Sequence, residues 1–329
     1  MVAPDAPAAM SSTSSSPTFS VIIAVYQAAQ YVGAALASVM AQTTPAFEVI
    51  ICDDGSTDDL AAALAPFLDR VTLLHQENRG EAAAKNRAAL TATGEYVVIL
   101  DADDVWEPER LAALGTLASL RPDLDILTTD AHFEVDGQVR GRFYDDQMRF
   151  PVDQQPAEIL DRCFVMPHAA VRRRRWLELG GFDGAMRPAS DWDFYIRAVL
   201  TGSRVGIVDA PLARYRLVPH SMSADRARSL RARVTVLDKT ATSGALPPEL
   251  ESALHSARRR HERRASLAEA EEALRSGGPD ARRAALALAR SSGQPAVTRL
   301  KAAFATVAPG VARRVLSTRA PGRLARPHT

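Results

Sequence analysis

Four short apolar runs rich in β-branched residues recur through the first hundred residues, at a spacing of roughly 25 residues. They occupy residues 19–26, 47–54, 71–76 and 96–103. Continuous apolar runs, unlike alternating ones, indicate strands that are buried on both faces, as in a parallel sheet. Helical patterns fill the intervals at 31–40, 58–68 and 81–91. This alternation predicts an α/β fold with a doubly wound, mostly parallel sheet and right-handed crossovers.

Carboxylates follow two of these predicted strands. They are Asp53, Asp54, Asp101 and Asp103. Ligands of doubly wound sheets bind at the carboxyl ends of the strands, and clustered carboxylates repel one another unless a cation or donor groups compensate them. Asp58 or Asp104 could instead cap the helix that follows. Capping alone does not account for four acids at one edge of the sheet.

Asp101 and Asp103 have the spacing expected for a divalent metal site. Alternate strand residues share a face, and Mg²⁺ commonly takes one or two carboxylates together with substrate phosphates. We therefore expect Mn²⁺ or Mg²⁺ there, bridging a diphosphate that becomes a good leaving group. Lys85 and Arg87 lie one segment upstream and could assist, or could simply face solvent from a helix.

A second acidic segment follows the tandem glycines at 180–181. Asp191 and Asp193 flank Trp192, and the residues after them fit one face of a helix. Asp191 would then sit at the start of that helix. Two roles are open for it, an N-cap or a general base beside an aromatic side chain that stacks on a ring.

Charge is distributed unevenly along this chain of 329 residues, whose net charge is only +1. Residues 225–329 hold 21 Lys and Arg against 9 Asp and Glu, or +12, and the remainder holds 19 against 30, or −11. Two cysteines, Cys52 and Cys163, are too few for a disulfide scaffold and favour a reducing compartment. Neither a dinucleotide-binding glycine motif nor a P-loop is present.

The two ends of the chain have distinct compositions. Residues 1–17 predict a disordered arm, and we expect neither a secretory signal nor a membrane-spanning helix. Residues 226–329 form an Ala- and Arg-rich extension with predicted helices from 247 to about 275, at 280–290 and at 295–307. Residues 298–329 carry seven Lys and Arg and no acid, which fits either a frayed tail or an interfacial element that binds anionic lipid.

Five segments in order resemble family-2 glycosyltransferases. These are SVIIAVYQAAQYVG and the later DDGS within 20–59, ENRGEAAAKNRAAL at 77–90, GEYVVILDADDVWEPERL at 94–111, GGFDGAMRPASDWDFYIRA at 180–198 and YRLVPHSMS at 215–223. The resemblance covers roughly residues 18–225, the predicted catalytic domain. It implies the nucleotide-diphospho-sugar transferase fold and an inverting, metal-dependent transfer of a sugar to an acceptor hydroxyl.

The resemblance also implies roles for individual residues. Asp54, with Asp53 beside it, would contact the nucleotide, and Lys85 would help to bind the donor. Asp101 and Asp103 would hold ribose, metal and diphosphate, while Asp191 would be the catalytic base. Trp192 would lie near the sugar or acceptor, and His220 near the diphosphate, although His220 could equally be an ordinary loop residue. Ser190 departs from the family pattern, which has glutamate at that position, and Lys85 stands where arginine is common.

These features predict a cytoplasmic enzyme of cell-surface glycan or glycolipid synthesis. Its expected partners are a UDP- or GDP-sugar donor and a glycan or lipid-linked acceptor. A peripheral contact with the inner face of the membrane is a further expectation, and no nucleic-acid partner is expected. Two alternatives remain, a catalytically silent sugar-nucleotide or carbohydrate-binding relative and a haloacid-dehalogenase-like phosphatase. The phosphatase would require its Asp-x-Asp after the first strand, whereas here it follows the fourth run.

Overall fold

The computed structural model describes residues 16–146, 148–218, 225–244, 246–276, 280–291 and 293–312. One mixed sheet organises the first two thirds of the chain, in the order β3-β2-β1-β4-β8-β6-β9-β5, with β7 paired to β6. Its strands are β1 (Phe19–Val25), β2 (Glu48–Asp53), β3 (Thr72–His75), β4 (Tyr96–Ile99), β5 (Val105–Trp106), β6 (Ile126–Val135), β7 (Gln138–Arg142), β8 (Ala170–Arg172) and β9 (Val205–Arg216). From β3 to β4 the strands are parallel, which confirms the strands predicted from the four apolar runs.

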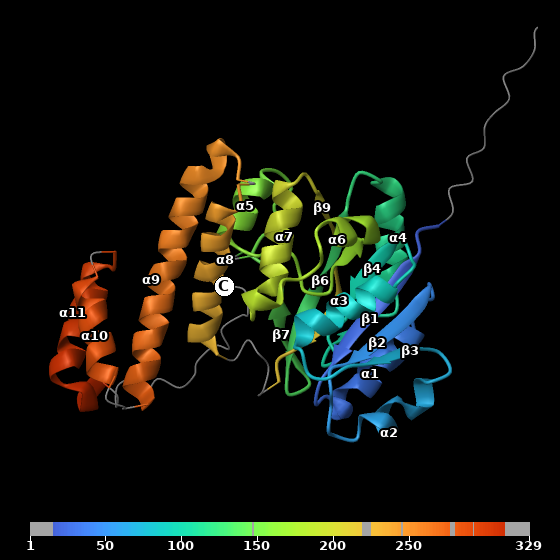
Figure 1. The fold of residues 1–329 in the computed structure, drawn as a ribbon, viewed down its shortest axis with the longest axis horizontal. Helices are drawn as coiled ribbons and strands as arrows, with labels where there is room; N and C mark the ends of the chain where they lie inside the picture. The colour runs from blue at the N-terminus through green and yellow to red at the C-terminus, as the bar shows by residue number, and fades with distance from the viewer. Residues whose placement is uncertain are drawn as a thin grey trace, which may run out of the picture.

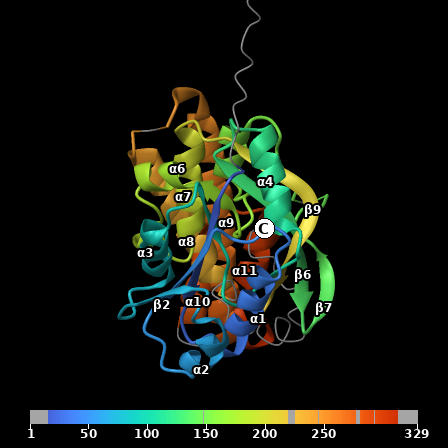
Figure 2. The same cartoon turned by 90° about the vertical axis from the view of Figure 1, so that its right-hand side faces the viewer.

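Helices cover both faces of this sheet. They are α1 (Ala29–Met40), α2 (Leu60–Leu64), α3 (Glu81–Thr91), α4 (Arg110–Leu120), α5 (Gln155–Asp161), α6 (Arg173–Glu178) and α7 (Ser190–Leu200). Figure 2 shows α3 and α7 on one side of the strands and α1 and α4 on the other. Successive strand residues alternate between the two sides, so Ile22 packs in one apolar cluster while Val21 and Ile23 pack in the other. This two-sided burial is why the strands read as continuous apolar runs.

The chain after residue 225 continues as helices. They are α8 (Arg226–Thr242), α9 (Glu251–Ser276), α10 (Asp280–Arg290) and α11 (Ala296–Val307). The three helices predicted in this region correspond to α9, α10 and α11, whereas α8 was not predicted. Val236 and Leu237 of α8, with Leu254 and Ala257 of α9, belong to the same apolar cluster as α3 and α7. In Figure 1, α10 and α11 lie at the end of the molecule farthest from β1–β3. No helix in the described ranges is long and apolar enough to cross a membrane.

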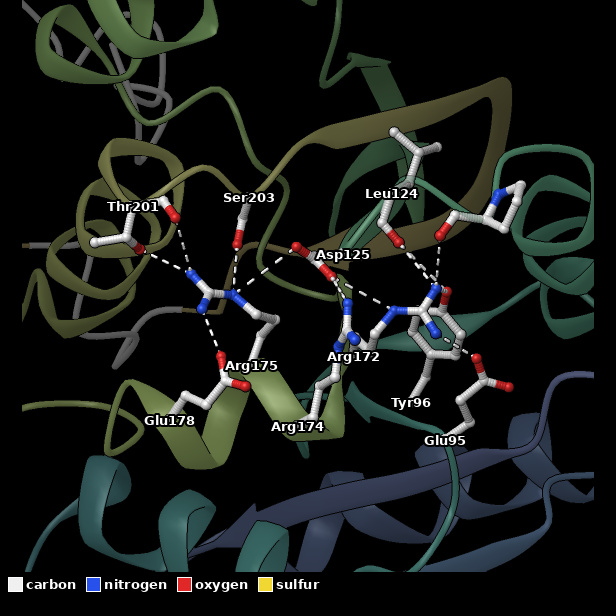
Figure 3. Close-up of polar contacts among 11 residues, drawn as sticks. Glu95, Tyr96, Leu124, Asp125, Arg172, Arg174, Arg175, Glu178, Thr201 and Ser203 are labelled. Atoms are coloured by element: carbon white, nitrogen blue, oxygen red, sulfur yellow. Dashed lines mark hydrogen bonds and ion pairs between the residues drawn. The ribbon is translucent and has the colours of Figure 1, made fainter.

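Consecutive arginines form ion pairs and hydrogen bonds at the end of the sheet opposite the predicted site (Figure 3). Side chains of Arg172, Arg174 and Arg175 lie 3.5, 3.5 and 3.8 Å from the Asp125 carboxylate. Arg172 also donates to the Tyr96 hydroxyl at 2.6 Å, at the start of β4. These ion pairs and the Arg172–Tyr96 hydrogen bond connect β4, β6, β8 and α6, and they give three of the four consecutive arginines a structural role.

Candidate active site

A cavity of about 610 Å³ opens at the carboxyl ends of β1 and β4, walled by α3, α7 and α8. Six of the predicted site residues line it, namely Asp54, Lys85, Asp101, Asp103, Asp191 and Trp192. Asp53 does not line it, and His220 lies outside the described residues. The cavity therefore collects side chains from residue 54 to residue 192 at the sheet edge where ligands of α/β proteins bind.

Asp53 is the last residue of β2, Asp54 follows it, and both form hydrogen bonds within the protein. Asp53 accepts from the Ser56 N–H and from His75 Nδ1, both at 2.8 Å. Burial alone would raise the pKa of Asp53. The hydrogen bonds from Ser56 and His75 outweigh this effect, so the net pKa is lowered. Asp54 is buried, and its oxygens accept from Gln76 Nε2 at 2.7 Å and from the N–H groups of residues 79 and 80 at 2.8 Å. It thereby fixes the turn that leads into α3.

Lys85 of α3 lies buried at the base of the cavity. Its Nζ donates to Asp101 at 2.6 Å and contacts Glu81, one helical turn earlier. Burial lowers the pKa of Lys85, but the charges of Asp101 and Glu81 outweigh it and raise the pKa, so the ammonium stays protonated. Arg87 instead faces outward and donates to the carbonyl of His75 at 2.7 Å. Of these two basic residues, Lys85 is the one that lies in the site.

The acids after β4 form one tight cluster. A turn at 102–103, rather than strand alternation, brings them together, because β4 ends at Ile99. Burial, followed by the charges of Asp104 and Asp101, raises the pKa of Asp103 to about 8. Asp104 caps no helix; it accepts from buried His168 Nε2 at 2.6 Å and from the Arg216 N–H at 2.6 Å. Asp58, the other capping candidate, accepts from Ala29 N–H at the start of α1 at 2.8 Å.

This acidic cluster has the chemistry of a divalent cation site. Ligand atoms of Asp101, Asp104 and His168 lie within 4.8 Å of one another, and Asp103 adjoins them. Besides burial, repulsion between neighbouring carboxylates raises the pKa of Asp103, and a bound cation would offset that repulsion. Oxygen ligands suit Mg²⁺ and Mn²⁺. The residues present therefore fit a divalent metal. Arg110, fully buried, supports the cluster from behind by donating to the His168 carbonyl at 2.6 Å.

Asp191 faces the same cavity from the first turn of α7. The N-cap of this helix is Ala189, and the Asp191 carboxylate accepts from the Trp192 N–H at 2.7 Å. The N-cap interpretation of Asp191 is therefore wrong. Burial raises the pKa of Asp191, although the Trp192 N–H and the charge of Lys85 oppose this rise. Ser190, beside it, also lines the cavity.

Trp192 contributes to the wall of the cavity but is anchored behind it. The side chain is buried, its indole N–H donates to the Ile159 carbonyl at 2.7 Å, and its ring lies 5.2 Å from that of His261 in α9. The tryptophan thus connects α7 to α5 and to the C-terminal helices.

Several residues in or behind the site were not predicted from the sequence. Arg233 and Ser229 reach the cavity from α8, beyond the motif-bearing region, and Arg233 is close enough to influence Asp191 electrostatically. His168 lies in a segment without a recognised motif. An arginine in a basic helical stretch gave no signal that it faces a cavity. His168 could have been suspected only as a titratable residue close to a predicted strand.

A family model described as Glycosyl transferase family 2 matches residues 20–180. EpsH of Bacillus subtilis (strain 168), whose name assigns it to the glycosyltransferases, is 29% identical over 216 residues, which is 61% of this chain and 61% of that protein. The matched region thus spans less than two thirds of that relative's length.

Solved structures resemble the whole fold. Residues 1–349 of TarS from S. aureus, in complex with UDP, superpose with a TM-score of 0.58 at 18% identity, over 94% of this chain and 93% of that one. The mannosyltransferase PcManGT from Pyrobaculum calidifontis, in complex with GDP-Man and Mn²⁺, gives 0.57 at 22% identity, over 93% and 88%. At these identities the likeness establishes the fold, which is of the GT-A type. Residues 20–180 therefore carry the glycosyl transferase family 2 domain that the family model describes.

Proposed function

We propose that this protein is an inverting glycosyltransferase that moves a sugar from a nucleotide-diphospho-sugar to an acceptor hydroxyl. The observation that carries the proposal is one cavity lined by Asp101 and Asp103, next to the metal-suited group of Asp101, Asp104 and His168, with a separate half-buried carboxylate at Asp191. The first group suits a diphosphate and the second suits proton removal. The retained carboxylate at 191 argues against a catalytically silent relative, and an Asp-x-Asp after β4 argues against a phosphatase.

The donor end of the cavity would be built on Asp101, Asp103 and Lys85. Asp101 and Asp103 would hold Mn²⁺ or Mg²⁺, and a bound cation supplies positive charge that offsets the charge developing on the departing diphosphate. Lys85 stays protonated and keeps Asp101 in place. Asp54 would act on the nucleotide indirectly, by holding the turn into α3.

Asp191 would act as the general base. Its carboxylate takes the proton from the acceptor hydroxyl, and the oxygen forms its bond to the anomeric carbon on the face opposite the diphosphate. The bond from carbon to diphosphate breaks, and the nucleoside diphosphate leaves with the electron pair. A carboxylate whose pKa is raised by burial is a stronger base than an exposed one, which suits this role. Ser190 lacks the carboxylate of the usual glutamate, so Asp191 works here without an acidic neighbour at position 190.

The substrates fall in the class of UDP- or GDP-hexoses and a glycan or lipid-linked acceptor of the cell surface. Support comes from relatives whose names record UDP, or GDP-Man with Mn²⁺. We place the reaction on the cytoplasmic side, where both cysteines, Cys52 and Cys163, would remain free as they are here.

The test is nucleoside diphosphate release from a panel of UDP- and GDP-sugars, with Mn²⁺ or Mg²⁺ and with or without candidate acceptors. D191N should lower transfer about 10²–10⁴-fold while donors still raise the melting temperature. D103A should remove the metal-dependent part of donor binding. D146N, at an exposed acid, is the matched control and should behave as wild type. Full transfer by D191N would refute the base assignment, and donor binding without turnover of any donor would favour the silent relative.

A further inference from the structure

One face of α11 is apolar and exposed. Its four side chains are Val297, Leu300, Phe304 and Val307, which are 64, 73, 56 and 82% exposed. Spacings of three, four and three residues place them in one row along the helix. Ala302 and Ala305 of the same helix are buried in small apolar clusters with α9 and α10. The helix is therefore packed on its alanine side and presents a row of large apolar groups on another side.

Basic residues accompany this row. The described residues between 280 and 312 include five Lys and Arg and one acid, Asp280. Lys301 is exposed and lies four residues from Val297 and three from Phe304, so it borders the row. A contiguous apolar row beside positive charge is the pattern of a helix that lies in a membrane interface, with apolar groups at the acyl boundary and cations at anionic headgroups.

We propose that α11, with Lys301 beside its apolar row, docks onto an anionic lipid bilayer through Val297, Leu300, Phe304 and Val307. A second copy of the chain fits this face less well, because two surfaces of the same positive charge repel. Four side chains are also far fewer than the roughly 20–30 residues a side that stable interfaces use. The inference requires no transferase chemistry, so it stands or falls separately from the proposed function.

The test uses the full-length protein and co-sedimentation with vesicles of phosphatidylcholine, either alone or mixed with phosphatidylglycerol. We expect binding to the mixed vesicles at about 0.1 M salt and weaker binding at about 1 M. The double variant L300S/F304S should bind about a hundredfold more weakly, because each apolar side chain withheld from the bilayer weakens binding roughly tenfold. L120S is the matched control, since Leu120 in α4 is 74% exposed against 73% for Leu300.

Four outcomes would overturn the proposal. They are equal binding of L300S/F304S and wild type, equal binding to both kinds of vesicle, a dimer in light scattering that L300S/F304S dissociates, and a lowered melting temperature for L300S/F304S but not for L120S. The last two would mean that a second copy or another part of the chain covers the row. Donor turnover by L300S/F304S in detergent-free solution should equal that of wild type, which separates loss of docking from loss of catalysis.

Discussion

Replacing Asp54 with alanine should remove a large share of the stability of this protein. The carboxylate is buried and accepts three hydrogen bonds, from Gln76 Nε2 and from two backbone N–H groups at the entry to α3. D54A would therefore leave three donors facing a gap. The same turn positions α3, and through it Lys85, so the change should also weaken donor binding.

The size of the effect follows from these contacts. A hydrogen bond to a charged group contributes about 1.5–3 kcal/mol, so three would give roughly 4.5–9 kcal/mol if they were additive. Asp54 borders an open cavity, and water entering the gap would hydrate part of what is lost. We therefore expect D54A to lower the free energy of unfolding by about 3–4 kcal/mol, a large part of the 5–15 kcal/mol typical of native proteins. D54N keeps one acceptor oxygen and should lose about half as much.

Urea unfolding measures this loss through the midpoint, provided that the slope is unchanged. D58A is the matched control, because Asp58 lies in the same loop but is exposed and accepts one N–H, from Ala29. D58A should lose about 1 kcal/mol, as helix caps do. If D54A shifts the midpoint no further than D58A, the three bonds do not hold the turn as argued.

Three further predictions concern charged groups. K85M should weaken donor affinity at least about tenfold, because it removes the cation that pairs with Asp101. R87M, on the outer face of the same helix, should leave the donor affinity measured by isothermal titration calorimetry unchanged. Because the pKa of Asp103 is about 8, Mn²⁺ affinity should rise about tenfold per pH unit up to pH 8 and then level off; a flat titration would contradict this. Burial and nearby arginines lower the pKa of His261 to about 3, below its unfolded value near 6.5. The contribution of His261 to stability is therefore present above pH 6.5 and falls by about 1.4 kcal/mol for each unit that the pH drops below that value. H261F should flatten this part of the plot of urea midpoint against pH.

The strands and the acidic edge could be predicted because both depend on local sequence. Ile22 and Ile23 pack in apolar clusters on opposite faces of the sheet, and both are buried. Because both faces are buried, the strand sequence is continuously apolar, and the packing could be predicted from it. Contacts between residues far apart in the sequence produce no local pattern from which they could be predicted. The His168–Asp104 bond spans 64 positions, and Arg233 reaches the cavity only because α8 folds back along α7. Asp101 and Asp103 both line the cavity, but a turn rather than strand alternation brings them together.

The uneven charge of the chain gains a physical meaning from how α8 and α9 are attached. Lys239 of α8 lies 2.8 Å from Asp183 and 2.7 Å from Asp193, and Arg260 of α9 pairs with Asp161. Basic helices are thus held against acids that precede residue 225, and Asp193 lies in the same helix as Asp191. If Asp191 is the base, two separate parts of the chain determine its surroundings. The carboxylates that would hold the donor, Asp101 and Asp103, follow a strand, whereas Arg233 belongs to a helix beyond residue 225. Changes in α8 can therefore alter the wall beside the base without touching the groups that would hold the donor.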